Sequence, residues 1–156
     1  MIEIHDVHQT EKLALLVGQL AQPGDNLILT GDLGAGKTTL TKGIAKGLGI
    51  SQLIKSPTYT IIREYEEGRL PLYHMDVYRV EYGASDLGLD EYFEGEGLTV
   101  IEWGNLLAEA RPEDYLELTL LKDPLAINHR RIELTAFGAQ AENFKQRILT
   151  AWPKHG

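Results

Sequence analysis

A loop with three glycines, followed at once by a lysine and a threonine, joins two segments near the start of the chain. Residues 31–38 read Gly-Asp-Leu-Gly-Ala-Gly-Lys-Thr, with a short apolar run before them at residues 26–30. We predict a helix at residues 37–48, which Gly49 is placed to end. The pattern G-x-x-x-x-G-K-[ST] between a strand and a helix is the P-loop signature, also called Walker A. This signature restricts the chain to α/β folds.

Each fixed position of this loop has a mechanical reason. Gly31, Gly34 and Gly36 allow backbone torsions that turn successive N–H groups inward, and they leave room for phosphate oxygens. The helix that begins near Lys37 points its positive dipole end at the same anions. Lys37 would reach the β- and γ-phosphates, and the Thr38 hydroxyl is a magnesium ligand in this motif. We therefore predict a site for a nucleoside triphosphate and Mg²⁺.

The rest of the chain predicts a single domain over residues 1–156. Thr10 is placed to cap a helix that ends before residues 23–24, and two hairpins are expected, with turns at residues 66–69 and 122–128. The expected strands are residues 2–4, 26–30, 58–65, 70–78, 98–102, 116–121 and 131–136, and the other expected helices are residues 86–93 and 139–149. This order predicts a three-layer P-loop NTPase-like sandwich. Its mixed sheet would be parallel near the nucleotide, extended by antiparallel hairpins and flanked by helices.

Charge and composition narrow the classes of function. The chain has 15 Lys and Arg against 23 Asp and Glu, a net charge of −8, whereas a protein that binds nucleic acid alone normally presents a basic face. If nucleic acid is involved, another subunit should supply most of the phosphate contacts. The absence of cysteine excludes disulfides, thiol catalysis and cysteine-bound zinc. With no membrane-spanning run and no signal peptide, we expect a cytoplasmic protein without membrane contact.

Two acidic residues at strand ends are candidates for the catalytic site. Asp76 lies near the end of one predicted strand, where His74, Asp76 and Tyr78 alternate and so share a face. Glu102 ends the apolar run of residues 98–101, at the point where it meets Trp103. Ligands of such sheets lie beyond the carboxyl ends of parallel strands, so a carboxylate there faces the nucleotide. Magnesium needs such oxygen ligands, and hydrolysis needs a group that orients water.

Other residues near these positions have more than one interpretation. Thr58, in Ser-Pro-Thr-Tyr-Thr at residues 56–60, is either a switch residue that senses the γ-phosphate or part of a strand-entry turn. Taken alone, Trp103 is typical of core or interface packing and His74 of a hydrogen-bonded structural residue.

Four motifs occur in order: the loop with Thr39 after it, residues 56–60, His-x-Asp-x-Tyr-Arg at residues 74–79, and Ile-Glu-Trp-Gly at residues 101–104. In this combination the chain resembles the TsaE (YjeE) family, the ATPase subunit of the bacterial machinery for tRNA threonylcarbamoyladenosine. The match extends over nearly the whole chain.

The resemblance implies an ATPase, weak on its own, coupled to a heterodimer of a threonylcarbamoyl transferase and its paralogous partner subunit. Through that complex it would act indirectly on the tRNA adenosine beside the anticodon. By this resemblance, Thr38 and Glu102 hold Mg²⁺ and Asp76 assists as a Walker-B-like acid. The remaining implied positions are Gly34, Ala35, Gly36, Lys37, Thr38 and Thr39 for phosphates, Thr10 near the base, and Trp103 for activity or partner contact. ATP binding would order the loop around Thr58, and hydrolysis would release the partners.

Two other P-loop classes serve as alternatives. A regulatory GTPase usually carries Asn-Lys-x-Asp and Asp-x-x-Gly, and neither occurs in the sequence. A small-molecule kinase would need an acceptor pocket and an arginine-bearing lid, and no lid segment is evident. Release of bare phosphate, rather than a phosphorylated acceptor, would distinguish the ATPase from the kinase.

Overall fold

The computed structural model describes residues 2–31, 37–51, 62–76, 90–93, 95–102, 112–123 and 125–152. Seven of their strands form one sheet in the order β1-β7-β6-β2-β5-β4-β3. The strands are β1 (Ile2–Ile4), β2 (Asn26–Gly31), β3 (Ile62–Tyr65), β4 (Leu72–Asp76), β5 (Leu98–Glu102), β6 (Tyr115–Asp123) and β7 (Ala126–Phe137). The described helices are α1 (Val7–Leu20), α2 (Lys37–Gly47), α3 (Asp90–Phe93) and α4 (Ala139–Ala151).

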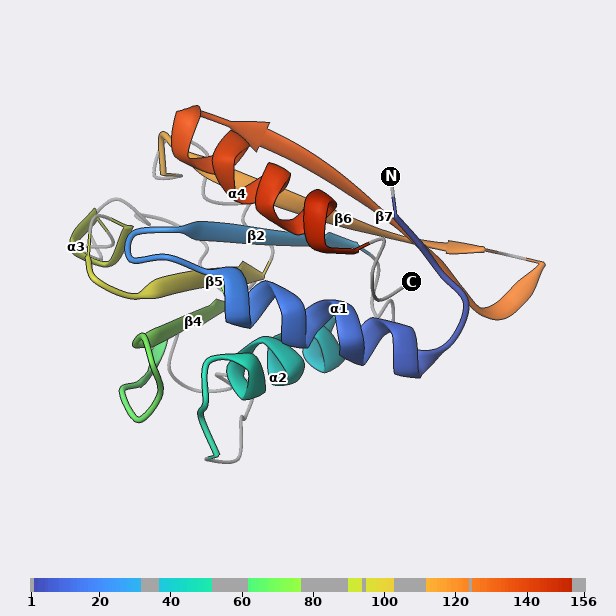
Figure 1. Cartoon of the computed structure of the whole chain (residues 1–156), viewed down its shortest axis with the longest axis horizontal. Helices are drawn as coiled ribbons and strands as arrows, with labels where there is room; N and C mark the ends of the chain where they lie inside the picture. Colours follow the sequence, from blue (N-terminus) through green and yellow to red (C-terminus); the bar gives the residue numbers. More distant parts are fainter. Residues whose placement is uncertain are drawn as a thin grey trace.

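The sheet is mixed, as the sequence predicts. The central strand β2 runs parallel to β5 on one side and to β6 on the other, and β4 runs parallel to β5. The pairs β3–β4, β6–β7 and β1–β7 are antiparallel. The parallel strands therefore lie at the centre, and antiparallel strands extend the sheet to its edges (Figure 1).

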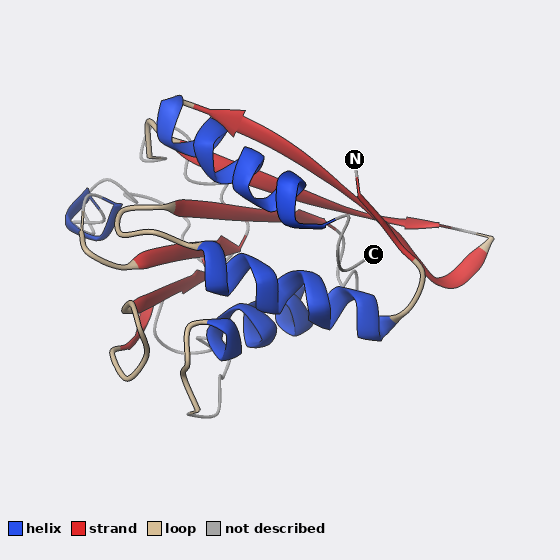
Figure 2. Cartoon of the chain, viewed as in Figure 1, coloured by secondary structure: helices blue, strands red, loops and turns tan. Residues whose placement is uncertain are grey.

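Helices cover both faces of the sheet, which confirms the three-layer arrangement. Successive side chains of β2 point to opposite faces of the sheet. Leu27 and Leu29 point to one face and belong to the core cluster formed with α1, α2 and α4. These three helices lie on one side of the sheet in Figure 2. Asn26 points to the other face, where its side-chain amide donates to the carbonyl of Phe93 in α3 at 3.3 Å. On that face Tyr92 of α3 makes an edge-to-face contact with Tyr73, with ring centroids 5.0 Å apart.

Helices α1 and α2 pack with almost no space between their backbones. A Cβ atom on Gly18 of α1 would come within 2.2 Å of the Ile44 carbonyl oxygen of α2, and one on Gly47 within 2.3 Å of the Leu15 carbonyl oxygen. A Cβ atom on Gly43 would meet the Cβ of Ala14 at 2.4 Å. Real Cβ atoms do not approach so closely, so only glycine permits this separation. The position of α2, and hence of Lys37 at its start, depends on this contact.

Two arginines satisfy carbonyl groups at the end of α1 that have no partner within the helix. Arg69, in the connection between β3 and β4, places Nη2 2.8 to 3.1 Å from the carbonyl oxygens of Gly18, Gln19 and Ala21. Arg147 of α4 donates through Nη1 to the carbonyl oxygen of Leu20. The helix end is therefore attached both to the β3–β4 hairpin and to α4.

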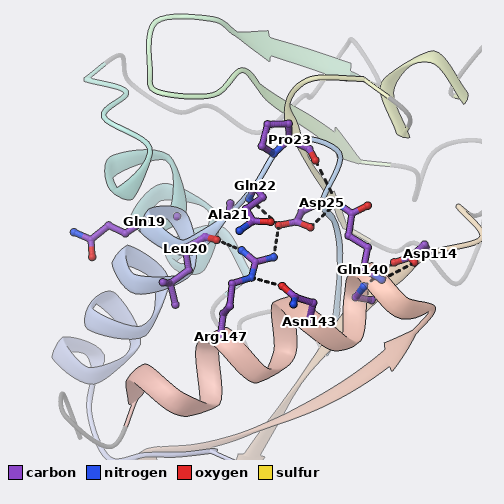
Figure 3. A network of polar contacts seen from close by, with 12 residues as sticks. Gln19, Leu20, Ala21, Gln22, Pro23, Asp25, Asp114, Gln140, Asn143 and Arg147 are labelled. Atoms are coloured by element: carbon purple, nitrogen blue, oxygen red, sulfur yellow. Dashed lines mark hydrogen bonds and ion pairs between the residues drawn. The ribbon is translucent and has the colours of Figure 1, made fainter.

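Asp25 links the turn before β2 to α4 (Figure 3). Its side chain is 1% exposed and accepts from Nη2 of Arg147 at 3.1 Å. It also accepts from the Gln22 backbone N–H at 2.7 Å and from Nε2 of Gln140 at 2.9 Å. At the start of α4, Asp114 accepts from the backbone N–H groups of residues 140 and 141, at 3.0 and 2.8 Å. Carboxylates from outside α4 thus bind its first turn and Arg147 in its third turn.

The predicted elements are confirmed wherever the structure describes them, with one correction to a cap and longer strands in the second hairpin. Thr10 is not the N-cap of α1: the cap is Asp6, whose Oδ1 accepts from the Gln9 N–H at 2.9 Å. The helix therefore begins four residues earlier than a cap at Thr10 would allow, because Asp is as good a cap as Thr and precedes the apolar stripe. Gly49 has a φ of +85° after α2, as expected for a glycine that ends a helix. Within the described ranges, every helix is too short or too polar to span a lipid bilayer.

Replacing Gly18 with alanine should destabilise the fold. The new methyl group meets backbone atoms of α2, which cannot move aside, and overpacking of this kind costs about 1–3 kcal/mol. The free energy of unfolding, measured by urea titration, should fall by that amount. Gln19→Ala, at the exposed neighbouring position, is the control and should change it by less than about 0.5 kcal/mol. A Gly18→Ala variant as stable as the parent would show that the helices do not pack this closely.

Removing the Asp25 carboxylate should also destabilise the protein. Asp25→Ala leaves Nη2 of Arg147 and the Gln22 N–H without their acceptor, and loss of one partner from a buried pair costs about 3–5 kcal/mol. Thermal unfolding followed by circular dichroism measures the loss. Asn143→Ala removes only the exposed contact to Nε of Arg147 and should cost under about 1 kcal/mol. Equal losses in the two variants would contradict the role of Asp25.

Candidate functional site

The described parts of the P-loop are its two ends. Strand β2 ends at Gly31 and helix α2 begins at Lys37, as the loop signature requires. Lys37 is buried, with 6% of its surface exposed, and its Nζ donates to the carbonyl oxygen of Gly31 at 2.7 Å. This hydrogen bond connects Gly31, at the end of β2, to Lys37, at the start of α2. Gly34, Ala35 and Gly36 lie outside the described residues, so their phosphate contacts stay predictions.

Helix α2 presents hydroxyl groups in its first turn, next to the loop, and lysines further along its length. Thr38 is exposed and Thr39 is half-buried in the first turn, where N–H groups of a helix have no intrahelical partner. Thr39 also lines a groove of about 550 Å³ between α1 and α2. Among the described residues, Lys12, Lys42 and Lys46 line this groove together with a single acidic residue, Glu11. On a chain with a net charge of −8, this face is therefore locally suited to anions.

Glu102 is brought to the same edge of the sheet by strand register. It is the last residue of β5, and its Cα pairs with Leu29 of β2 on one side and with Asp76 of β4 on the other. Because β2 continues from Leu29 into the P-loop, the Glu102 carboxylate lies beside the strand that delivers the phosphate-binding loop. The prediction that Asp76 and Glu102 lie at strand ends is confirmed, and the structure adds that their strands are parallel neighbours. The Asp76 side chain is not among those described.

A histidine holds the Glu102 carboxylate. Nε2 of His74 lies 2.6 Å from Oε2 of Glu102, and the two side chains are 2% and 8% exposed. His74 pairs in register with Val100, so it reaches Glu102 diagonally, one step along the same face of the sheet. The sequence predicted a hydrogen-bonded histidine, which is confirmed, but it did not predict the partner. The alternation of His74 and Asp76 was the available signal, and only the β4–β5 register shows which residue it leads to.

The other ring nitrogen of His74 shows where the proton lies. Nδ1 is buried and has no hydrogen-bond partner among the residues described. A proton on Nδ1 would be a buried donor without an acceptor, which costs about 1–3 kcal/mol, and Nε2 would then present a lone pair to the carboxylate. The arrangement that satisfies both groups has the proton on Nε2, donated to Oε2 of Glu102.

The roles of three further predicted positions stay predictions. Thr58 and Trp103 lie outside the described residues, so their roles in switching or partner contact stay predictions. Thr10 is 8% exposed in the first turns of α1, and its hydroxyl donates to the Asp6 carbonyl oxygen at 3.5 Å. Its proposed place near the base stays a prediction, and little of its surface is available for contact.

The family model described as "Threonylcarbamoyl adenosine biosynthesis protein TsaE" matches residues 4–132. The chain belongs to the TsaE family. The matched TsaE region contains both ends of the loop, Asp76 and Glu102, so the resemblance seen in the motifs is confirmed.

Individual TsaE relatives cover most of the chain. The Bacillus subtilis protein named tRNA threonylcarbamoyladenosine biosynthesis protein TsaE is 51% identical over 134 residues, covering 86% of this chain and 84% of its own. A Nostoc protein of the same name is 44% identical over 124 residues, 76% of each chain. The crystal structure of YdiB from Bacillus subtilis aligns with a TM-score of 0.84 at 42% identity, over 96% of this chain and 93% of that one. The fold found here is thus also that of a solved relative.

Proposed function

We propose that the chain is the Mg²⁺-dependent ATPase subunit required for threonylcarbamoyl transfer to the adenosine next to the anticodon of tRNA. The observation that carries the proposal is the position of Glu102. A buried carboxylate ends β5 beside the strand that leads into the P-loop, and a histidine holds one of its oxygens. The family description and the names of its relatives supply the pathway.

The phosphates would be bound at the start of α2. The ammonium group of Lys37 donates a hydrogen bond to the Gly31 carbonyl oxygen. When the nucleotide binds, this group would donate to phosphate oxygens instead. Gly34 to Gly36 and Thr39 would add backbone and hydroxyl donors. The lysines of the α1–α2 groove would raise the local concentration of the anionic nucleotide. ATP is the proposed nucleotide because no guanine-selecting motif occurs in the sequence.

The residues at this edge fit a magnesium ion. Thr38 supplies an exposed hydroxyl and Glu102 a carboxylate, and hard oxygen ligands of this kind are what Mg²⁺ binds beside substrate phosphates. Asp76, in register with Glu102 on the next strand, would assist through its own carboxylate. When bound, the metal neutralises charge on the β- and γ-phosphates. Glu102 and Asp76 would also be the groups that orient the attacking water.

The partners would be the transferase subunit and its paralogous companion, which together hold the tRNA. With a net charge of −8, this chain itself has little capacity for an extended RNA contact. In the proposed cycle, ATP orders the loop around Thr58 and favours the partner-bound state, and hydrolysis releases it. Trp103, directly after Glu102, would transmit the state of the site to the partner surface.

Two substitutions separate nucleotide binding from turnover. Lys37→Ala should weaken ATP binding by on the order of a hundredfold, because a charge-assisted contact to phosphate is lost. Glu102→Gln should keep binding within about threefold yet reduce turnover on the order of a hundredfold or more, because the amide replaces the charge and the base. Calorimetry measures binding, and phosphate release measures turnover.

The matched controls are Lys145→Ala on α4 and Glu133→Gln on β7, which change the same residue types outside the site. Both should bind and hydrolyse ATP as the parent does. Undiminished hydrolysis in the Lys37 or Glu102 variant would refute the role assigned to that residue.

The coupling to partners is tested by affinity. With Mg²⁺ present, the chain loaded with a non-hydrolysable ATP analogue should bind the purified heterodimer at least about tenfold more tightly than the chain loaded with ADP. Lys37→Ala should abolish the difference. Equal affinities for the two loaded forms of the parent chain, measured by biolayer interferometry, would rule out a nucleotide-driven switch.

A further inference from the structure

We propose that His74 is a positioning residue that holds the Glu102 carboxylate in the orientation that metal binding and turnover require. This inference rests on the proposed ATPase function and adds to it a residue that acts through Glu102 rather than on the nucleotide. Nε2 of His74 is hydrogen-bonded to Oε2 of Glu102. The other carboxylate oxygen, Oε1, would then contact the metal ion or the attacking water.

The position of His74 along β4 supports this role. Its neighbour on the same face is Leu72, which is fully buried in the core, and its cross-strand partner Val100 is also 0% exposed. The next residue on that face is Asp76, at the edge where the nucleotide is proposed to bind. His74 thus lies at the boundary between the apolar core and the polar edge, one register step behind the two carboxylates.

The energetic balance argues that stability alone does not require a histidine here. A buried polar side chain must be hydrogen-bonded to offset its loss of water, and within the described part of the chain His74 finds a partner only for Nε2. Replacing a buried polar pair by apolar side chains is often neutral or stabilising, so an aliphatic residue would suit the core side of this position. What an aliphatic residue cannot do is restrict the rotamers of Glu102.

The same geometry recurs where carboxylates or histidines bind metals. A ligand side chain is flexible, and a hydrogen bond from a neighbouring residue fixes its orientation before the metal arrives. Loss of such a partner typically lowers metal affinity or activity about 10- to 100-fold. Because the donor is Nε2, glutamine is the conservative substitution, since its amide nitrogen can occupy a similar place. Leucine is the substitution that removes the donor.

The test compares His74→Leu with His74→Gln. We expect His74→Leu to lower kcat about 10- to 100-fold while KM for ATP changes by less than about threefold. With a non-hydrolysable ATP analogue bound, its affinity for Mn²⁺, measured by electron paramagnetic resonance, should fall about tenfold or more. His74→Gln should restore both quantities to within about threefold of the parent. Val100→Ala, a buried neighbour on the same face without a polar group, is the control for general disturbance and should retain both.

The proposal is overturned if His74→Leu leaves kcat and Mn²⁺ affinity unchanged. It is also overturned if His74→Gln is as deficient as His74→Leu, or if Val100→Ala shows the same loss of turnover. Each of these results would mean that the hydrogen bond does not orient Glu102.

A double-mutant cycle separates this inference from the proposed function. In a Glu102→Gln background, His74→Leu should have no further effect on Mn²⁺ affinity, because the group it positions is already changed. If Glu102→Gln alone affects neither Mn²⁺ affinity nor turnover, the role of Glu102 in the proposed ATPase is wrong. If Glu102→Gln has its full effect and His74→Leu has none, only the role of His74 fails.

Discussion

The parallel pairing of β2 with β5 is the constraint on which the rest of the site depends. It places Leu29, two residues before the end of β2, opposite Glu102, and so sets the carboxylate beside the origin of the P-loop. A shift of one residue in this pairing would turn Glu102 to the other face of the sheet. It would also turn the apolar side chains of β5 away from the layer against which each of them packs. All five residues of β5 are buried, so both faces of the sheet oppose such a shift. The core thereby specifies the geometry of the site.

The second element that the site needs is the start of α2, and its position follows from the packing of α1. Because Gly18, Gly43 and Gly47 have no side chain, α1 and α2 approach until their backbones nearly touch at Gly18 and Gly47 and the Ala14 side chain packs against Gly43. The far end of α1 is attached to the β3–β4 hairpin by Arg69 and to α4 by Arg147. Through these contacts the three helices on one face form a single layer. Lys37 is therefore fixed relative to β2, to which it is also attached by the hydrogen bond from its Nζ to the Gly31 carbonyl oxygen.

The parts of the structure that sequence could predict are those that local chemistry determines. The loop signature located β2 and α2, Gly49 marked the end of α2, and the apolar run before Trp103 located β5 to the residue. The cap of α1 was misplaced because both Asp6 and Thr10 can cap, and the choice depends on how the helix meets β1. The Asp25–Arg147 pair, 122 positions apart, and the His74–Glu102 bond depend on how the strands and helices come together in space. No local pattern contains that information, so these contacts could not be derived from the residues alone.

A crystal structure of the chain with Mg²⁺ and a non-hydrolysable ATP analogue would test the role of Glu102 most directly. We expect the metal to contact the Thr38 hydroxyl and, directly or through one water, Oε1 of Glu102. We also expect Nε2 of His74 to stay bonded to Oε2, and Nζ of Lys37 to have moved from the Gly31 carbonyl to the phosphates. A metal ion bound to the nucleotide with Glu102 turned away from it would show that this carboxylate does not hold the metal.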